Sequence, residues 1–172
     1  MIRLARYEDL DGVVKVIDDA KSLFKGEGSD QWQDTDNYPN FNTMLKDYEK
    51  QELYVKLIDE KVVGCIVLSK TKEEAYDLIY DGAWLTDEDY FVIHRLAVAK
   101  EFYRTGVAKE LIEYVIGVTK SYNINSIRVD TKVENARMIN LLSSFNFKIV
   151  GKIDLLRKDV LDKVRLALEL KM

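Results

Sequence analysis

The sequence contains few of the residues that build metal and disulfide sites. Among its 172 residues there are one cysteine, one histidine and one proline. A single cysteine cannot form an internal disulfide, and one cysteine with one histidine is too small a set for a typical zinc centre. We therefore expect no metal site. We expect Cys65 to be a small core residue in a reducing compartment, a role that its type favours over that of a nucleophile.

Long apolar runs and an excess of positive charge are also lacking. The longest apolar run, Val62 to Leu68, is far shorter than a membrane span and already contains Gly64. Inside a strand, this glycine is expected to mark a bulge or a close backbone approach. The N-terminal stretch MIRLARYEDLDG has no apolar core of the kind found in signal peptides. A net charge of −4 and a pI near 5.2 argue against nucleic acid as a partner. These features predict a cytoplasmic protein, a single domain over residues 1–172, without a membrane or nucleic-acid partner.

The spacing of apolar residues predicts alternating strands and helices in the order β-α-α-β-β-β-α-β-α-β-β. Strands are expected at 2–6, 53–58, 62–68, 90–98, 126–133, 147–153 and 164–170, and helices at 8–25, 41–48, 107–122 and 135–145. The nearly continuous apolar strand 90–98 should lie centrally in the sheet. The β-α-β segment that it begins implies a parallel pair, whereas the flanking hairpins imply antiparallel pairs. The predicted fold class is a mixed α/β (α+β) sheet covered by helices.

Strand 90–98 leads into E-F-Y-R-T-G-V-A-K at 101–109, where a glycine opens the next helix. The first N–H groups of a helix have no acceptor within the helix, and the helix dipole favours an anion there. Gly106 has no Cβ and would let a pyrophosphate approach the main chain, while Arg104 and Lys109 would add positive charge. The alternative is that Gly106 only allows close packing of helix on strand. Neither the Walker nor the Rossmann glycine pattern is present.

Two motifs resemble those of the GCN5-related N-acetyltransferases (the GNAT superfamily). Y-R-T-G-V-A at 103–108 resembles the superfamily's Q/R-x-x-G-x-G/A signature, and it follows Val98-Ala99-Lys100 in place of a V-x-P-like strand end. N-A-R-M-I-N-L-L-S-S-F-N-F at 135–147 is similar to the N-x-x-A-x-x-L-Y-x-x-x-G-F element. The order of predicted elements also matches the superfamily across nearly the whole chain.

The resemblance implies a central, mostly antiparallel sheet with a splayed parallel strand pair, and acetyl-CoA as the cofactor. It implies direct attack of an amine in a ternary complex, without a covalent enzyme intermediate. By position, the resemblance assigns the cofactor contacts to Leu96, Ala97, Val98, Tyr103, Arg104, Thr105, Gly106, Val107, Ala108, Lys109 and Asn135. Asn135 has an alternative role as a helix N-cap, and both roles are compatible.

Four positions depart from the superfamily pattern. Tyr103 stands where glutamine or arginine is usual, and Ala108 replaces the second glycine. Asn146 replaces the glycine before the terminal phenylalanine, and asparagine also tolerates the left-handed conformation of a helix C-terminus. Leu142 falls where many members place a tyrosine that protonates the leaving thiolate. A thiol with a pKa of about 8.5 can leave without full protonation, so the absence of the tyrosine would not prevent turnover. Ser143 or a water could also act as the acid.

Two catalytic roles follow from the resemblance. The backbone N–H of Val98 would donate to the oxyanion, which is the main electrostatic requirement of acyl transfer. His94, four residues earlier on the same strand, is the candidate base, because an imidazole with a pKa near ~6.5 suits proton transfer at physiological pH. The alternatives are a structural histidine, or a base among Asp87, Glu88 and Asp89.

Two segments would wall the acceptor site in this superfamily, G-E-G-S-D-Q-W-Q-D-T-D-N-Y-P-N at 26–40 and D-G-A-W-L-T-D-E-D-Y at 81–90. Their carboxylates and aromatic rings suit a cationic amine. We name Trp32, Trp84 and Asp87 as candidate acceptor contacts, and a small-molecule amine as the partner. The alternative is a purely structural role, in which the charges face solvent and Trp32 anchors the loop to the core. The oligomeric state is left open between a monomer and a homodimer.

Two other functions compete with catalysis. A non-catalytic acyl-CoA-binding regulatory module would keep the anion site and lose the acid, as Leu142 suggests. An unrelated α/β domain, in which the Gly106 turn serves only packing, would have no affinity for coenzyme A.

Overall fold

The computed structural model describes residues 1–158 and 160–172. Its strands are β1 (Ile2–Leu4), β2 (Leu53–Ile58), β3 (Lys61–Ser69), β4 (Phe91–Val98), β5 (Ser126–Thr131), β6 (Lys148–Asp154) and β7 (Val164–Lys171). Its α-helices are α1 (Leu10–Gly26), α2 (Phe41–Glu49), α3 (Val107–Ser121) and α4 (Ala136–Ser144). Three short 3-10 turns, η1 (Tyr7–Asp9), η2 (Glu74–Leu78) and η3 (Lys100–Phe102), complete the described elements. The predicted order of strands and helices is confirmed.

The strand order β1-β2-β3-β4-β5-β7-β6 confirms the mixed, mostly antiparallel sheet. Strands β4 and β5 run parallel, with Phe91 opposite Ile127 and Val92 opposite Arg128. The described residues group into two compact units, one of residues 1–68 and 94–115 and one of residues 69–93 and 116–172. Strand β4 and helix α3 contribute residues to both units. The two units are described separately below.

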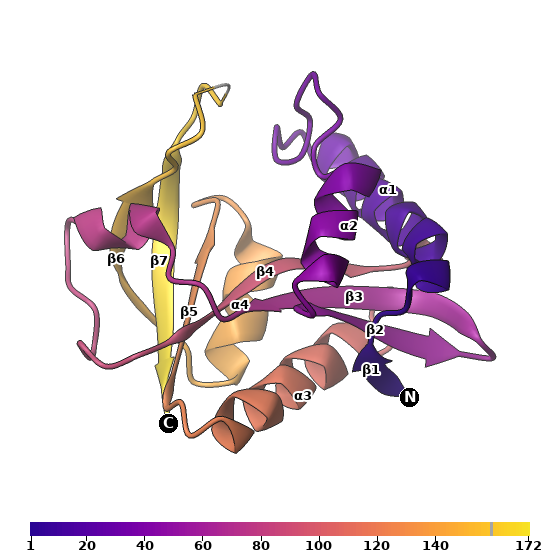
Figure 1. Ribbon diagram of the computed structural model, residues 1–172. Helices are drawn as coiled ribbons and strands as arrows, with labels where there is room; N and C mark the ends of the chain where they lie inside the picture. Colours follow the sequence, from indigo (N-terminus) through magenta and orange to yellow (C-terminus); the bar gives the residue numbers. More distant parts are fainter. Residues whose placement is uncertain (159) are drawn as a thin grey trace. The chain divides into compact units, whose positions relative to one another are not determined.

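The core of the first unit lies between the sheet and helices α1 and α2. Side chains at helical spacing on α1 pack with Met44 of α2 and with inward-facing residues of β2 and β3; the buried set is Leu10, Val13, Val16, Ile17, Ala20, Met44, Leu53, Val55, Cys65, Val67 and Ala97. In Figure 1, α1 and α2 lie on one side of β2 and β3, and the beginning of α3 lies on the other. Burial of each large aliphatic side chain contributes about 1.5–3 kcal/mol.

Gly64 marks the closest approach of α3 to the sheet. A Cβ at this position would lie 2.8 Å from Val107 Cγ1 and 3.0 Å from Leu111 Cδ1. The β2–β3 pairing also shifts register here, between Lys56 and Leu57. The expectation that Gly64 marks a bulge or a close backbone approach is therefore confirmed.

The second unit is built on the antiparallel pairs β5–β7 and β6–β7. Residues 74–90 contain η2 and an isolated bridge between Tyr80 and Lys152 of β6. This bridge and the hydrogen bond from Ala83 N–H to Val150 O, 2.9 Å long, cover the outer edge of β6. Pairing of this kind satisfies backbone groups that an edge strand would otherwise expose.

The C-terminus of α4 closes as its sequence indicates. Asn146 has a φ of 69°, in the left-handed region that asparagine tolerates well. The N–H groups of Asn146 and Phe147 donate to Ser143 O at 3.0 Å and to Leu142 O at 3.2 Å. The asparagine thus does the work of the usual glycine, as predicted.

Within the described ranges, no helix combines the length and apolarity needed to cross a membrane.

Gly82→Ala should disrupt the edge of the second unit. A Cβ at Gly82 would lie 1.9 Å from Val150 O, so the backbone would have to move away from β6. We expect a loss of about 3 kcal/mol in the free energy of unfolding, measured by urea denaturation.

Gly117→Ala is the matched control. A Cβ there meets no atom within 4 Å, and Gly117 lies inside α3. Alanine should therefore leave stability unchanged or raise it by about 0.5–1 kcal/mol. Equal effects of the two substitutions would show that the 79–83 segment does not pair with β6 as described.

Candidate active site

The turn between β4 and α3 exposes the start of a helix. The first hydrogen bond of α3 runs from Glu110 N–H to Gly106 O, 3.0 Å long. The N–H groups of Gly106 and of residues 107–109 precede this bond, so the helix offers them no acceptor. Together with the helix dipole they favour the binding of an anion at this position.

Gly106 serves conformation and open space, not packing. Its φ is 93°, which a residue with a Cβ adopts only with strain, and a Cβ built there meets no atom within 4 Å. The close helix–strand contact that Gly106 was expected to allow, in the alternative interpretation, is made by Gly64 instead. The space in front of Gly106 is what a pyrophosphate needs to approach the main chain.

Asp19 of α1 holds the loop that precedes α3. Its carboxylate Oδ2 accepts from Lys100 N–H at 2.8 Å, and its backbone carbonyl accepts from the Tyr103 hydroxyl at 3.1 Å. The Tyr103 side chain, which replaces the usual glutamine or arginine, therefore anchors the loop on α1. Arg104, which has a φ of 61°, and Lys109 are exposed on either side of Gly106. The sequence predicted that their positive charges would lie beside the helix start.

His94 carries no charge at physiological pH. Burial lowers the pKa of the imidazole to about 3, and the positive charges of Arg95 and Lys50 act in the same direction. The sequence-based argument assumed a pKa near 6.5, and it missed the two neighbouring cations. A group with so low a pKa is a weak base, so His94 can take part in catalysis only as a neutral hydrogen-bonding group.

Arg95 is the functional candidate that sequence reasoning missed. Its φ is 47°, a left-handed conformation inside strand β4 that costs roughly 1–2 kcal/mol for a residue other than glycine. The guanidinium binds the Asp47 carboxylate with two hydrogen bonds, Nε to Oδ2 at 2.7 Å and an Nη to Oδ1 at 2.8 Å. A third bond, 2.9 Å long, goes to the Tyr38 hydroxyl. An arginine within the apolar run F-V-I-H-R-L-A-V was the available signal, because a buried cation requires an anionic partner.

The pKa of Arg95 is raised. Burial alone would lower it, and the carboxylate of Asp47 with the Tyr38 hydroxyl outweighs that effect. Both side chains of the ion pair are largely buried, with exposed fractions of 15% for Arg95 and 6% for Asp47. Burial also raises the pKa of the Asp47 carboxyl, and the Arg95 guanidinium acts against that rise, so the carboxylate that joins α2 to β4 depends on Arg95.

Cys65 lies beside this connection and is not a nucleophile. Its side chain is fully buried, and burial raises the pKa of the thiol to about 12. The Sγ–H points to the backbone carbonyl of Arg95, 3.8 Å away. The interpretation of Cys65 as a core residue is confirmed.

The remaining strand residues of the predicted site differ in exposure. Ala97 belongs to the buried core of the first unit, while Leu96 and Val98 are half-buried at the end of β4. The roles assigned to their backbone groups stay predictions.

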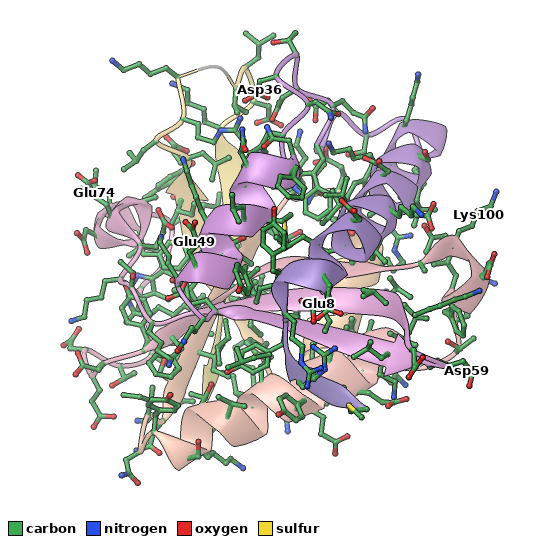
Figure 2. The ribbon with its side chains drawn as sticks, turned by 45° about the vertical axis from the view of Figure 1, so that its right-hand side comes forward. Glu8, Asp36, Glu49, Asp59, Glu74 and Lys100 are labelled. Atoms are coloured by element: carbon green, nitrogen blue, oxygen red, sulfur yellow. The ribbon has the colours of Figure 1, made fainter. Side chains whose placement is uncertain are left out.

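The loop between α1 and α2 is held by its own contacts. Lys21 Nζ donates to Asn37 O and Pro39 O, both at 2.6 Å. The Trp32 ring packs edge-on against Phe24, with centroids 5.4 Å apart, and it contacts the core. Trp32 thus anchors the loop to the core, as the structural alternative predicted. Figure 2 labels Asp36 in this loop and Glu49 at the C-terminal end of α2.

Trp84 and Asp87 lie in the second unit. The Trp84 indole N–H donates to Tyr76 O at 2.8 Å, and the guanidinium of Arg128 lies 4.2 Å from the ring centroid. The cation that Trp84 binds is therefore a residue of the protein, itself also 3.9 Å from the ring of Tyr90. Asp87 is exposed in the adjoining loop.

Asn135 and Leu142 also belong to the second unit. The Asn135 side chain accepts from Met138 N–H at 3.2 Å and donates to Thr131 Oγ1 at 3.2 Å. Its N-cap role on α4 is therefore present. Leu142 has no exposed surface, so the position of the superfamily's tyrosine is filled by a core side chain.

The first unit contains the candidate residues His94, Leu96, Ala97, Val98, Tyr103, Arg104, Thr105, Gly106, Val107, Ala108, Lys109 and Trp32. These residues come from β4, from the turn before α3, from the first turn of α3 and from the loop after α1. The candidates Trp84, Asp87 and Asn135 are in the second unit.

The depressed pKa of His94 makes a stability prediction. Between the folded value of about 3 and the ordinary value of 6.5, the unfolded chain binds more protons than the folded chain. The stability attached to the neutral imidazole is therefore complete above pH 6.5 and is lost progressively as the pH falls toward 3. At pH 5 the loss should be about 2 kcal/mol relative to pH 7.5.

Urea unfolding of the wild type and of His94→Gln at pH 7.5 and 5.0 checks this value. The glutamine variant keeps every other titrating group, so it should lose about 2 kcal/mol less than the wild type. The same pH dependence in both proteins would mean that His94 is not held neutral by the fold.

Comparisons with known proteins agree with the architecture. The sequence matches the model of the acetyltransferase (GNAT) family over residues 17–147. The search of curated proteins finds no match. Among solved structures, a GNAT-family acetyltransferase from Streptococcus agalactiae 2603 is 31% identical with a TM-score of 0.89, and the alignment covers 100% of this chain and 95% of that chain.

More distant structures share the fold. The ribosomal-protein-S18-alanine N-acetyltransferase from Escherichia coli is 12% identical, with a TM-score of 0.68 and coverage of 99% of this chain and 92% of that chain. A chain of the NatC complex bound to Gag peptide and CoA is 18% identical, with a TM-score of 0.68 and coverage of 100% and 98%. The family match spans most of the sequence, and the motifs at 103–108 and 135–147 predicted it. The chain belongs to the acetyltransferase (GNAT) family.

Proposed function

We propose that this chain, as one N-acetyltransferase domain over residues 1–172, moves an acetyl group from acetyl-CoA to a primary amine of a small cationic molecule. The observation that carries the proposal is the open helix start at Gly106. Gly106 is left-handed there, and among the described residues other than its two chain neighbours no atom lies within 4 Å of a Cβ built on it, so the helix start is open on that side.

The residues present fit acetyl-CoA. The N–H groups of residues 106–109 would bind the pyrophosphate, with the exposed side chains of Arg104 and Lys109 adding positive charge. Backbone groups of Leu96 to Val98 would hold the pantetheine arm as a neighbouring strand does. Asn135, which belongs to the second unit, keeps the cofactor role that the resemblance implies as a separate proposal. When bound, the cofactor supplies an acetyl thioester. The Val98 N–H is the proposed donor to the acyl oxygen.

In this proposal His94 is a neutral hydrogen-bonding group, whereas its residue type indicated a general base. Its neutral imidazole can accept one hydrogen bond and donate another, and so can orient the amine or a water that receives the amine's proton. Arg95 and Lys50, which help to lower the pKa of His94, would also lower the pKa of an amine bound nearby. The amine would then reach its reactive, unprotonated form more readily, and His94 would need to do less as a base.

Transfer proceeds by direct attack of the amine in this proposal. The one cysteine is fully buried with a pKa of about 12, so it provides no thiolate that could carry the acyl group. The reaction therefore depends on both substrates being held at the same time.

The acceptor class follows from the loop between α1 and α2. This loop carries the carboxylates of Glu27, Asp30, Asp34 and Asp36, which suit a cationic amine. Two cations lie at the base of this loop, where Lys21 donates to Pro39 O and Arg95 donates to the Tyr38 hydroxyl. Their positive charges offset part of the negative charge of the loop. The ring of Trp32 contributes by fixing the loop on α1.

A regulatory module that binds acyl-CoA without turnover is the competing function. Two observations favour it: Leu142 occupies the position of the usual acid as a core residue, and His94 is a weak base. Both functions predict acetyl-CoA binding, and only the enzyme predicts acetylated amine.

Gly106→Ala should weaken acetyl-CoA binding by tenfold or more. The new Cβ would project into the space reserved for the pyrophosphate, and the strained φ would disturb the N–H groups. The measurement is the thermal shift with acetyl-CoA at several concentrations. A wild-type protein with ligand at about one hundred times its Kd gains roughly 2.7 kcal/mol, or about 5–10 °C in Tm.

Gly28→Ala is the matched control for strain. Gly28 has a φ of 74°, and a Cβ there also meets no atom within 4 Å, but the residue lies after α1. Both variants should lose a similar amount of stability, roughly 1–2 kcal/mol, while only Gly106→Ala should lose the ligand shift. Normal acetyl-CoA binding by Gly106→Ala would remove the observation on which the proposal rests.

His94→Gln should lower turnover and leave acetyl-CoA binding unchanged. The amide groups of a glutamine lie in different positions from the two imidazole nitrogens, so they would orient the amine or its water poorly. We therefore expect kcat to fall on the order of 100-fold with a responsive amine from a polyamine and amino-sugar panel. The wild-type rate should show no inflection from His94 between pH 6 and 8. Full activity in the variant would exclude the orienting role of the imidazole, and no turnover by the wild type would favour the regulatory module.

A further inference from the structure

Arg95 is held in an unusual backbone conformation from two directions. With a φ of 47° it interrupts the extended backbone of β4 directly after His94. Its side chain binds Asp47 and Tyr38, and its backbone carbonyl receives the Cys65 thiol at 3.8 Å. Side chain and main chain of one residue are thus tied to α2, to the α1–α2 loop and to β3.

A left-handed residue inside a strand changes the direction of the next backbone groups. A residue in this region turns the next peptide plane, so the N–H and C=O groups after it leave the alternation of a regular strand. In β4 the groups concerned are those of Leu96, Ala97 and Val98. These are the backbone groups that the proposed function assigns to the pantetheine arm and to the acyl oxygen.

We propose that Arg95, Asp47 and Tyr38 form a positioning clamp, in which the two-pronged ion pair keeps Arg95 left-handed and thereby aims the backbone groups of Leu96 to Val98. This inference rests on the proposed function, and it deepens it by naming the residues that prepare the acyl-binding part of the site. Strained residues persist where surrounding contacts hold them, and the three side-chain bonds of Arg95 are such contacts.

The clamp also couples the acceptor loop to the strand. Tyr38 belongs to the α1–α2 loop, and its hydroxyl accepts from the same guanidinium that Asp47 fixes, at 2.9 Å. This bond joins two residues that are 57 positions apart in the sequence. Movement of the loop would therefore be transmitted to Arg95, and from Arg95 to the residue after it.

A purely structural ion pair is the alternative. The first unit contains a suitable comparison, because Arg3 of β1 binds Asp9 with two hydrogen bonds of 2.7 and 3.2 Å. This second pair is also partly buried, and β1 is separated from β4 by β2 and β3 in the sheet order. Asp47→Asn and Asp9→Asn are therefore matched variants, each of which removes one carboxylate charge from a two-pronged arginine pair.

The test compares binding of two ligands with amide exchange. Acetyl-CoA contacts both the proposed strand groups and the helix start, whereas ADP carries a pyrophosphate without the pantetheine arm. For Asp47→Asn we expect the Kd of acetyl-CoA to rise at least tenfold and that of ADP to change less than twofold. Tyr38→Phe removes a single hydrogen bond and should give a smaller change, on the order of threefold.

Hydrogen exchange of the unliganded proteins gives a second readout that needs no cofactor. In Asp47→Asn the amides of Leu96 to Val98 should exchange at least tenfold faster than in the wild type, relative to the amides of β2. In Asp9→Asn their exchange, and acetyl-CoA binding, should stay at the wild-type level. Equal effects of the two variants, or equal weakening of acetyl-CoA and ADP by Asp47→Asn, would overturn the clamp.

Failure of the clamp can be told from failure of the proposed function. If the wild type binds neither ligand at millimolar concentration, the acetyl-CoA function is overturned. Faster exchange at Leu96 to Val98 in Asp47→Asn alone would then still support the clamp as a device that orders β4. Wild-type binding with unchanged exchange and affinity in Asp47→Asn would overturn the clamp and leave the proposed function standing.

Discussion

The ion pair between Arg95 and Asp47 is the interaction on which the arrangement of the first unit's site depends. It is largely buried, and burying two charges is favourable only when their geometry and remaining hydrogen bonds are good. Two bonds to the carboxylate and one to Tyr38 meet that requirement. The same pair sets the electrostatic surroundings of His94, because the Arg95 charge helps to keep the imidazole neutral. Removing either partner would leave a buried charge alone, which typically costs about 3–5 kcal/mol.

A second constraint lies at the start of α3, where open space and conformation coincide. Gly64 allows the close packing of α3 on the sheet, so this packing does not depend on Gly106. The loop before α3 is held on α1 by Asp19, which accepts from Lys100 N–H and from the Tyr103 hydroxyl. The N–H groups that begin the helix can therefore face a ligand without loss of the local fold. The tyrosine that replaces the usual glutamine or arginine thus serves to anchor the loop, and the proposed anion site uses main-chain groups instead.

Much of the fold could be predicted from the sequence because the signals were local. Apolar periodicity located the helices and strands, and Asn146 was correctly interpreted as a left-handed helix terminus. Gly64 was interpreted as a close approach, which is a property of one backbone position and its neighbours. The family signature at 103–108 placed the helix start by the same kind of local pattern.

The site's chemistry was harder to predict because it depends on residues that are distant in sequence. The pKa of His94 reflects burial and the cations Arg95 and Lys50, the second of which lies on another element. The Asp47–Arg95 pair joins residues 48 positions apart, so no spacing rule could reveal it. Trp84 showed the same limit, since the cation above its ring is Arg128 of β5, which the aromatic-plus-carboxylate pattern could not anticipate.

The central claim is that the first unit binds acetyl-CoA through the main chain of β4 and the start of α3. The most direct measurement is a titration of the ¹⁵N-labelled wild-type protein with acetyl-CoA, followed by backbone amide NMR. The account predicts saturable shifts that are largest at residues 96–98 and 104–109, with a Kd in the micromolar range. Amides that stay unchanged at millimolar acetyl-CoA, or shifts that fall elsewhere in the chain, would contradict it.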